Sequence, residues 1–270
     1  MAHAAVESLS RVETSLLASW ERSGQTRITL DDLIASAPHH DPYVLASSLV
    51  RKGLLHRVAP GKFLVRALRT AGREWSPTAI AAAVAILTGE NYYLGGWWAL
   101  SFHRLSQQVY GSVLDVFVSR RRRHREVPGT RILFHVLPSD AFTWGIEVSE
   151  IEHQLTSVSD RERTILDALD HPSPYATVRG GLAVVQDVLR NAEFDGERLV
   201  DYALRAARPS TRVRLGVLLE DAHTQERLLR KLERGKEVSE RTLVSLVPGG
   251  ARRGQVRSRW SVLDNREAAG

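Results

Sequence analysis

The stretch VFVSRRRRHREVPG holds a run of five arginines directly after an apolar segment, namely Arg120, Arg121, Arg122, Arg123 and Arg125. Clustered guanidinium groups are suited to binding phosphate. The run connects two segments typical of strands, VLDVFVS and RILFHVL, and such a connection is expected at the surface, where arginines are also easily solvated. Two interpretations stay open: a solvated loop, or a loop that grips phosphates. Base contacts are disfavoured, because nothing there forms a rigid element that fits a groove.

Other residue types that could perform chemistry are scattered along the chain. There is no cysteine, and the ten histidines show neither a His-x-x-x-His nor an HExxH spacing. The GxxxxGK[ST], GxGxxG and GxSxG motifs are absent. Asp115 and Glu126 could serve a metal-dependent nuclease, but two carboxylates at this spacing are a weak signal in a chain with 31 acidic residues. We therefore expect no enzyme, no metal site and no cofactor.

Composition and charge indicate the broad class. The 270 residues are 43% hydrophobic, enough for a sizeable core and for two domains. No run of eighteen apolar residues occurs, so we expect a cytoplasmic protein that does not enter a membrane. The net charge is +6; residues 1–70 and residues 71–140 contribute +3 each, and the rest contributes zero. The excess of positive charge therefore lies where it could attract a polyanion.

The elements nearest the amino end form an ordered series. Residues 8–22 show the apolar spacing of an amphipathic helix that Gly24 ends, and Thr29 is a capping candidate for a second short helix. In the segment HHDPYVLASSLVRKG, Asp41 is a good N-cap, Pro42 suits the first helical turn and Gly53 ends the helix. The apolar side of this helix leaves Val44, Ser47, Ser48 and Arg51 on the opposite face, whose two serines and one arginine could enter a groove.

Two β-prone runs, LLHRV and KFLVR, follow this helix and are joined by APG, which predicts a hairpin. The complete order is that of a winged helix-turn-helix, in which the third helix enters the DNA major groove and the hairpin contacts phosphate. Arg57 and Lys62 are the candidate phosphate contacts of the hairpin. The alternative is a protein-interaction or dimerisation module; element order, cap chemistry and charge together favour double-stranded DNA.

The chain as a whole is predicted to have an α+β fold. A winged helix-turn-helix domain at 1–70 is followed by a mixed, mostly helical α/β domain at 71–270 with a small sheet. The aromatic stretch NYYLGGWWALSF is more typical of a core than of a stacking platform for bases. Four segments beyond residue 179 show the three- to four-residue apolar spacing of helices. A further helix is expected in DRERTILDALD, capped by Ser159 or Asp160.

The segments RKGLLHRVAPGKFLV, YYLGGWWAL and SVSDRERTILDAL resemble the AbiEi-type antitoxins of type IV toxin-antitoxin systems over about residues 10–235. The resemblance implies a bacterial repressor that binds inverted repeats in the promoter of its own operon and antagonises a nucleotidyltransferase-like toxin, without requiring a stable complex with it. It carries DNA contacts only onto the matching helix and wing, namely Tyr43, Val44, Ser47, Ser48, Arg51, Arg57 and Lys62. It places no antitoxic residue in the second domain.

Overall fold

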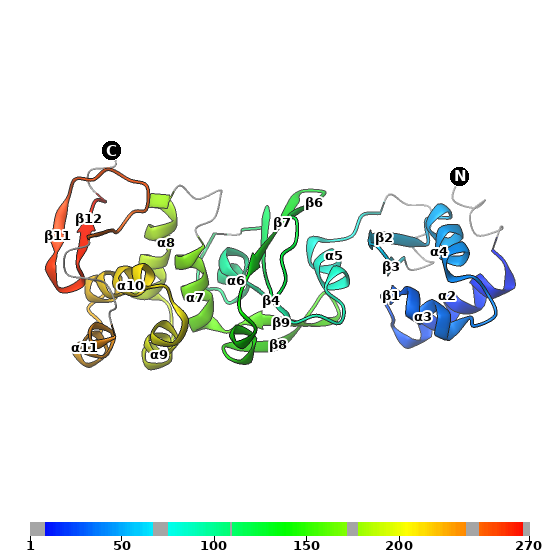
Figure 1. Cartoon of the computed structure of the whole chain (residues 1–270), viewed down its shortest axis with the longest axis horizontal. Helices are drawn as coiled ribbons and strands as arrows, with labels where there is room; N and C mark the ends of the chain where they lie inside the picture. The colour runs from blue at the N-terminus through cyan, green and yellow to red at the C-terminus, as the bar shows by residue number, and fades with distance from the viewer. Residues whose placement is uncertain (1–8, 67–74, 109, 172–177, 236–242, 267–270) are drawn as a thin grey trace. The chain divides into compact units, whose positions relative to one another are not determined.

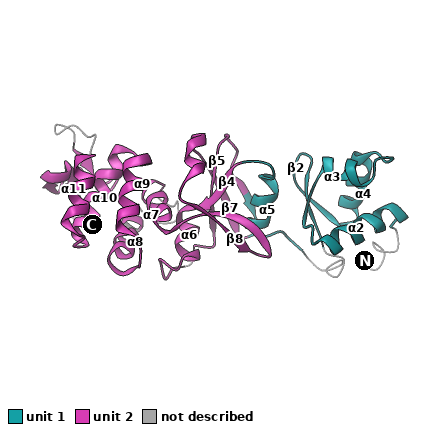
Figure 2. Ribbon diagram, turned by 90° about the horizontal axis from the view of Figure 1, so that it is seen from below, with its two compact units in different colours: residues 1–90, 126–128 teal, residues 91–125, 129–270 magenta. Residues whose placement is uncertain are grey.

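The computed structural model describes residues 9–66, 75–108, 110–171, 178–235 and 243–266 (Figure 1). The chain has a mixed α+β architecture and divides into two compact units, residues 1–90 with 126–128 and residues 91–125 with 129–270 (Figure 2). The domain boundary expected at residue 70 lies within 67–74, outside the described residues. In the described part, no helix is both long and apolar enough to cross a bilayer.

The first unit alternates helices with short strands. Its elements are α2 (Arg11–Ser23), β1 (Arg27–Thr29), α3 (Leu30–Ser36), α4 (Pro42–Arg51), β2 (Leu55–Ala59), β3 (Lys62–Val65) and α5 (Ala79–Ile86). Both β1 and β2 pair antiparallel with β3, so the strand order is β1-β3-β2. Apolar side chains of α2, α3 and α4 share one core with the sheet, including Leu17, Trp20, Leu33, Leu49 and Phe63.

Four helix ends of this unit lie where the sequence predicts them, because local interactions fix them, whereas the helix expected from residue 8 begins at Arg11. Thr29 caps α3, and the Asp41 carboxylate accepts hydrogen bonds from the first free backbone N–H groups of α4. Gly24 ends α2 in the left-handed conformation that glycine adopts without strain. Gly53, also left-handed, follows the last turn of α4. These cap predictions are confirmed.

A six-stranded sheet forms one layer of the second unit, although residues 126 and 127 of its edge strand are grouped with the first unit. Its strands are β4 (Tyr92–Gly95), β5 (Val113–Val118), β6 (Arg125–Val127), β7 (Thr130–Val136), β8 (Ile146–Ile151) and β9 (Gln154–Ser159), in the order β6-β7-β5-β4-β9-β8. β5 pairs parallel with β7, and β4 with β9, whereas β4–β5 and β8–β9 are antiparallel. The sheet is larger than the small one that the sequence predicted. Short β4 and half-exposed β8 were not predicted as strands, because they lack a clear apolar alternation.

Helices and a second, three-stranded sheet complete this unit. The elements are α6 (Gly96–Phe102), the 3-10 turn η2 (Ser139–Thr143), α7 (Arg161–Asp170), α8 (Val178–Asn191), α9 (Gly196–Ala206), α10 (Pro209–Asp221), α11 (Glu226–Arg234), β10 (Val244–Ser245), β11 (Gln255–Arg257), η3 (Ser258–Trp260) and β12 (Val262–Asp264). The strands follow the order β10-β12-β11. Helix α7 packs against α6, α8 and α9, and also contacts β4 and β9. It therefore joins the large sheet to the helical layer.

The paired glycines of YYLGGWW are explained by close packing around β4. A side chain at Gly95 would lie 2.8 Å from the Phe117 ring, and one at Gly96 would lie 2.8 Å from the Asp115 carboxylate. Gly96 also has a φ of 57°, which disfavours any other residue. Tyr93 and Trp97, on either side of the pair, are fully buried. The expectation that this aromatic stretch belongs to the core is confirmed for both of these rings.

Candidate nucleic-acid interface and a surface cavity

Helix α4 presents an exposed face near its amino end. Tyr43 and Val44 are 68% and 65% exposed, although large aromatic and branched side chains are normally buried. Ser47, one turn further along, is exposed too. Arg51 is exposed in the last turn. Four residues of the sequence-based DNA-contact set therefore lie at the surface of one helix.

Ser48 and Lys52 are engaged by a buried carboxylate of α2. The Ser48 hydroxyl donates to Glu13 Oε1 at 2.8 Å, and Lys52 Nζ lies 2.6 Å from Glu13 Oε2. Burial by itself would raise the pKa of Glu13, but hydrogen bonds, led by that from Lys52, outweigh it and lower the pKa to about 2. Ser48, a predicted DNA contact, thus holds α4 against α2. We leave it out of the proposed interface.

Replacing Glu13 with glutamine is expected to destabilise the first unit by roughly 2 to 3 kcal/mol, because the charge-assisted bonds to Lys52 and Ser48 are lost. Since the folded-state pKa is depressed, the wild-type contribution is complete above about pH 5 and is lost as the pH falls toward 2. Hydrogen exchange of the α2 and α4 amides between pH 7 and pH 3 measures both effects. The exposed Asp31→Asn serves as control and should change stability by less than about 0.5 kcal/mol.

Lys62, the second predicted wing contact, is bound within its own unit. Its Nζ donates to the carbonyls of Ile86 at 2.7 Å and Thr88 at 3.1 Å, at the carboxyl end of α5, and lies 3.4 Å from Glu90 Oε1. Carbonyls at a helix end lack intrahelical donors and attract a cation. With three acceptors around its ammonium group, Lys62 holds the hairpin to α5, and we leave it out of the interface as well.

A shallow groove separates α4 from the β2–β3 hairpin. It has a volume of about 120 Å³, and its lining includes Tyr43, Ser47 and the hairpin residue Arg57, which is exposed. These are three of the residues that the sequence singles out. The groove also includes residues that the sequence gave no reason to select, namely Leu30, Ala46, Val50, Gly61 and Phe63. The apolar ones were marked only by the hydrophobic pattern that builds the core, and Gly61 only by its place in the APG turn.

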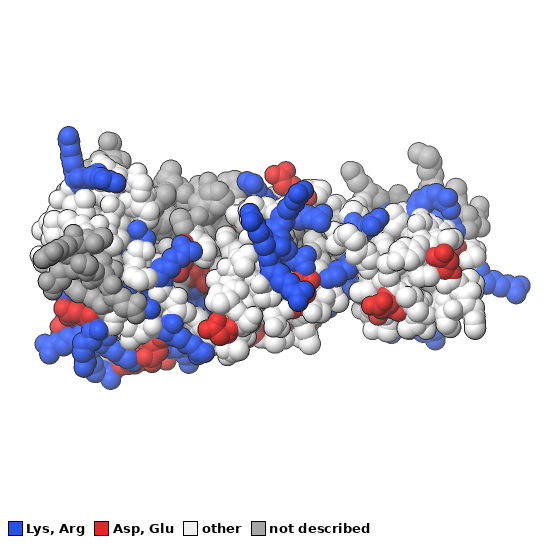
Figure 3. All heavy atoms as spheres, in the orientation of Figure 1, with Lys and Arg blue, Asp and Glu red and all other residues white. Residues whose placement is uncertain are grey.

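The arginine run follows β5 and ends at Arg125, the first residue of β6. Arg120, Arg121, Arg123 and Arg125 are exposed, and Arg122 is half-buried. Lys and Arg side chains gather on the surface over β5–β7 (Figure 3). The imidazole of His124, within the run, accepts a hydrogen bond from the Phe134 backbone of β7 at 3.1 Å, which holds the loop against the sheet. The run is thus a basic surface loop, and both of its interpretations stay open.

Asp115 lies inside the second unit. Its Oδ1 is 2.8 Å from His135 Nε2, and its Oδ2 accepts from the Trp97 backbone at 3.2 Å. Glu126, its suggested partner in a nuclease site, is exposed, whereas Asp115 is 2% exposed. Within the described ranges no three His, Asp or Glu residues are placed to hold one metal ion. The geometry gives Asp115 a structural place beside the glycine pair.

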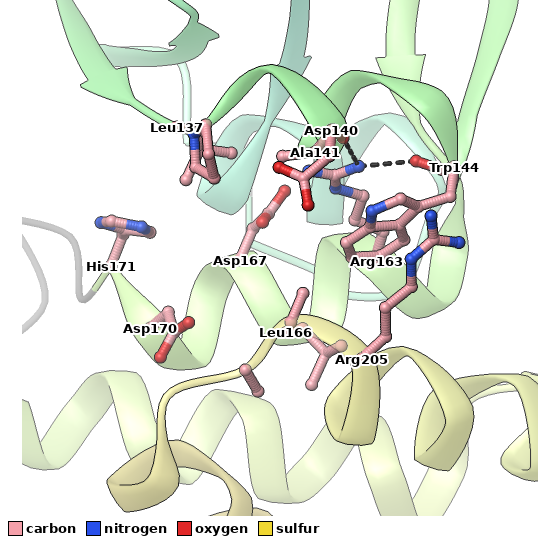
Figure 4. A pocket seen from close by; sticks show the side chains of 13 residues that line it. Leu137, Asp140, Ala141, Trp144, Arg163, Leu166, Asp167, Asp170, His171 and Arg205 are labelled. Atoms are coloured by element: carbon pink, nitrogen blue, oxygen red, sulfur yellow. Dashed lines mark hydrogen bonds between the residues drawn. The ribbon is translucent and has the colours of Figure 1, made fainter.

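A cavity of about 260 Å³ that opens to the surface lies in the second unit, between η2, α7 and the end of α9 (Figure 4). Sequence analysis named none of its residues as part of a site, although three of them lie in the segment SVSDRERTILDAL. The lining residues are Leu137, Pro138, Asp140, Ala141, Trp144, Arg163, Leu166, Asp167, Asp170, His171, Arg205, Ala206 and Ala207. They come from three segments far apart in the chain. Only the folded structure brings their carboxyl, imidazole and guanidinium groups together.

Arg163 forms one wall of this cavity and is 2% exposed. Its Nη1 donates to the carbonyls of Ala141 and Trp144, shown as dashed lines in Figure 4. Its guanidinium carbon lies 4.3 Å from the Tyr93 ring centre and 4.0 Å from that of Trp144. Both rings therefore stabilise the buried charge. Arg205, which is exposed, lies over the same Trp144 ring at 5.3 Å.

The cavity also contains two groups whose titration is displaced. Burial raises the pKa of Asp167 to about 8, although the nearby Arg163 charge opposes the shift. Burial lowers the pKa of His171 to about 3, so that its imidazole is neutral near pH 7. Asp170 accepts a hydrogen bond from Thr211, and burial raises its pKa too. Displaced pKa values inside a cavity are typical of binding sites.

Comparisons with known proteins concern the fold. No family model matches the sequence, and no curated protein matches it. The structure is similar to the crystal structure of the RV2827C protein from Mycobacterium tuberculosis, with a TM-score of 0.65 and 12% sequence identity, over 95% of this chain and 92% of that chain. At such an identity the likeness is one of fold alone. The α+β fold of this chain is thus shared with a solved protein over nearly its whole length.

Proposed function

We propose that the first unit is a winged helix-turn-helix that binds double-stranded DNA, with α4 in the major groove and the β2–β3 hairpin on a phosphate backbone. The observation that carries this proposal is the exposed side of α4, where Tyr43, Val44 and Ser47 stand free of the core beside the groove that Arg57 lines. The exposed tyrosine and valine lie on adjacent positions and so offer a small apolar surface next to this groove. Their methyl and ring edges suit thymine methyl groups.

The charges of the unit indicate which residues would contribute to affinity and which to sequence specificity. Lys52 and Lys62 are engaged within the unit, which leaves Arg51 on α4 and Arg57 on the hairpin as exposed cations of the interface. Few phosphate contacts give a moderate dependence on salt. Specificity would then depend on Tyr43, Val44 and Ser47. The exposed arginines 120, 121, 123 and 125 would add phosphate contacts without reading sequence.

The wider role that we propose is that of a transcriptional autoregulator and antitoxin, acting on inverted repeats in its own promoter and against a nucleotidyltransferase-like toxin. This part rests on the resemblance of YYLGGWWAL and SVSDRERTILDAL. In the structure, these segments form β4 with α6, and the β9–α7 corner, where Asp160 caps α7 and Ser159 bonds to Thr164. The motifs thus concern the architecture of the second unit. A nucleotidyltransferase-like gene adjoining this one, whose toxicity the chain suppresses on co-expression, would support the role.

The DNA-binding proposal is tested by replacing Arg51 and Arg57 together with alanine. Affinity for a duplex from the region upstream of the gene is expected to fall about 10- to 100-fold, and the slope of log affinity against log salt by about 2. Fluorescence anisotropy between 50 and 300 mM salt measures both quantities.

The matched control is Arg22→Ala, which removes an exposed arginine of α2 outside the proposed interface. It should leave both quantities unchanged. Tyr43→Ala should instead reduce the preference for the upstream duplex over a scrambled one, with little change in the salt slope. Unaltered affinity in the Arg51/Arg57 variant, or an equal loss in the Arg22 variant, would remove α4 and the hairpin from the DNA interface.

A further inference from the structure

The carboxyl end of α7 collects hydrogen-bond acceptors on one face. Asp167, Asp170 and His171 follow a spacing of three and four residues, so they lie on the same side of the helix, and all three line the cavity. The carboxyl end of a helix also carries the negative end of its dipole, which favours a positive charge nearby. The neutral His171 ring adds no positive charge of its own. This end of the cavity therefore suits a group that donates hydrogen bonds and carries positive charge.

One acceptor at this end is buried without a partner. Asp167 is 8% exposed; its Oδ1 accepts a hydrogen bond from the Tyr93 hydroxyl at 3.2 Å, while its Oδ2 has no hydrogen-bond partner in the described structure. Figure 4 shows its side chain pointing from α7 into the space below η2. A buried polar atom without a partner is costly and uncommon in folded proteins. Arg163 does not relieve it: its Nη1 donates to two backbone carbonyls, and its Nε, also buried, has no hydrogen-bond partner in the described structure.

The other walls indicate the body of the ligand. Leu137, Pro138, Ala141, Leu166, Ala206 and Ala207 are apolar. The indole of Trp144 forms a further side and already packs against two guanidinium groups, so its face is compatible with cations. A metal ion is a poor match, because the described residues offer no group of three ligands for one. Hydrocarbon walls around a few converging polar groups are typical of small-molecule sites.

We propose that this cavity binds a small organic cation, whose primary ammonium group pairs with the Asp167 carboxylate and whose hydrocarbon body packs between Leu137, Leu166 and Trp144. The proposal is independent of DNA binding by the first unit. Either can fail without affecting the other.

Binding of the cation exchanges it for a proton. Because burial raises the pKa of Asp167 to about 8, its carboxyl group is mostly protonated at pH 7 and must release that proton to solvent before it can pair with an ammonium group. The cavity then gains one positive charge and loses one. The charged or titratable groups that face Asp167 or share the cavity are Arg163, Asp170 and His171 of α7 and its end, Tyr93 of β4, Asp115 of β5, Asp140 of η2 and Arg205 of α9.

Benzylamine is a suitable probe, since it joins a primary ammonium group to a compact apolar ring. Calorimetric titration of the full chain at pH 6, 7 and 8 is expected to show saturable binding. Its affinity should rise close to tenfold between pH 6 and 7 and less steeply between pH 7 and 8. Benzyl alcohol, which has the same ring without the charge, should bind at least tenfold more weakly at pH 8.

Two variants assign the effect to one carboxyl group. Asp167→Asn should abolish saturable binding, whereas Asp140→Asn, at the exposed rim of the same cavity, should weaken it no more than threefold and retain its dependence on pH. Should Asp167→Asn fail to fold, wild-type titrations at pH 6.5 in two buffers of different ionisation enthalpy give the proton count directly. About one proton released per benzylamine is expected.

Four results would overturn the proposal: no saturable binding, equal binding of benzyl alcohol, a proton count near zero, or an affinity that falls as the pH rises. The last of these would mean that Asp167 binds its ligand as a protonated donor. The first would leave the unpaired oxygen without a cationic ligand of this kind.

Discussion

Replacement of Arg163 with methionine is expected to lower the free energy of unfolding of the second unit by about 3 to 5 kcal/mol. Methionine retains most of the apolar volume but donates no hydrogen bond. The carbonyls of Ala141 and Trp144 would lose a charged donor, and the space between the Tyr93 and Trp144 rings would lose its cation. Urea unfolding measures the loss in free energy of unfolding, and hydrogen exchange of the α7 amides gives an independent measurement of it.

Arg205→Met is the matched control, because Arg205 contacts the same Trp144 ring as Arg163 but from an exposed position. An exposed cation–π contact contributes only about 0.5 to 1 kcal/mol. The two substitutions are chemically identical, so the difference between them reports burial. Similar losses from both would show that the carbonyl bonds of Arg163 contribute little to stability.

Substitution of Gly216 by alanine is expected to destabilise the second unit by about 2 to 4 kcal/mol, against the usual preference of helices for alanine of about 1 kcal/mol. Gly216 lies within α10, and a methyl group there would be 2.3 Å from the Trp260 ring. That ring is fully buried in the core and cannot turn away. Thermal or urea unfolding of the variant gives the sign of the change directly.

A double-mutant cycle separates this clash from other effects. Trp260→Phe alone should be destabilising, because it removes part of a buried ring, yet in the Gly216→Ala background its cost should shrink or reverse. Gly111→Ala, where an added methyl group meets nothing within 4 Å, should stay within about 0.5 kcal/mol of the wild type. Simple additivity of the Gly216 and Trp260 changes would contradict the close contact.

The sequence predicted those parts of the fold that depend on local interactions. Asp41 and Pro42 define where α4 begins because the cap bond and the fixed proline φ act within three residues. The same holds for the capping of α7 by Asp160. Exposure of Val44, Ser47 and Arg51 also followed from helical spacing, since Leu45 and Leu49 had to face the core, whereas Tyr43 was named only through the resemblance.

Interactions between distant residues could not be predicted in this way. Ser48 and Lys52 lie on the polar side of α4, and nothing in their spacing shows that Glu13, 35 and 39 residues away, binds them both. Lys62 was equally plausible as a phosphate contact until the end of α5 was placed beside it. The cavity was invisible for the same reason, because its polar groups come from η2, α7 and α9.

The bonds of Lys62 make the hairpin and α5 parts of one cooperative structure. α5 packs against β2 and β3, and the lysine closes its carboxyl end, so the ladder of the hairpin and the last turn of the helix stabilise each other. A recombinant fragment that ends after β3 would leave the ammonium group of Lys62 without the α5 carbonyls, and it would expose the apolar side chains of β2 and β3 that α5 covers. The smallest part of the amino-terminal unit that can be isolated intact therefore extends through Glu90, some twenty residues past the end that its element order suggests.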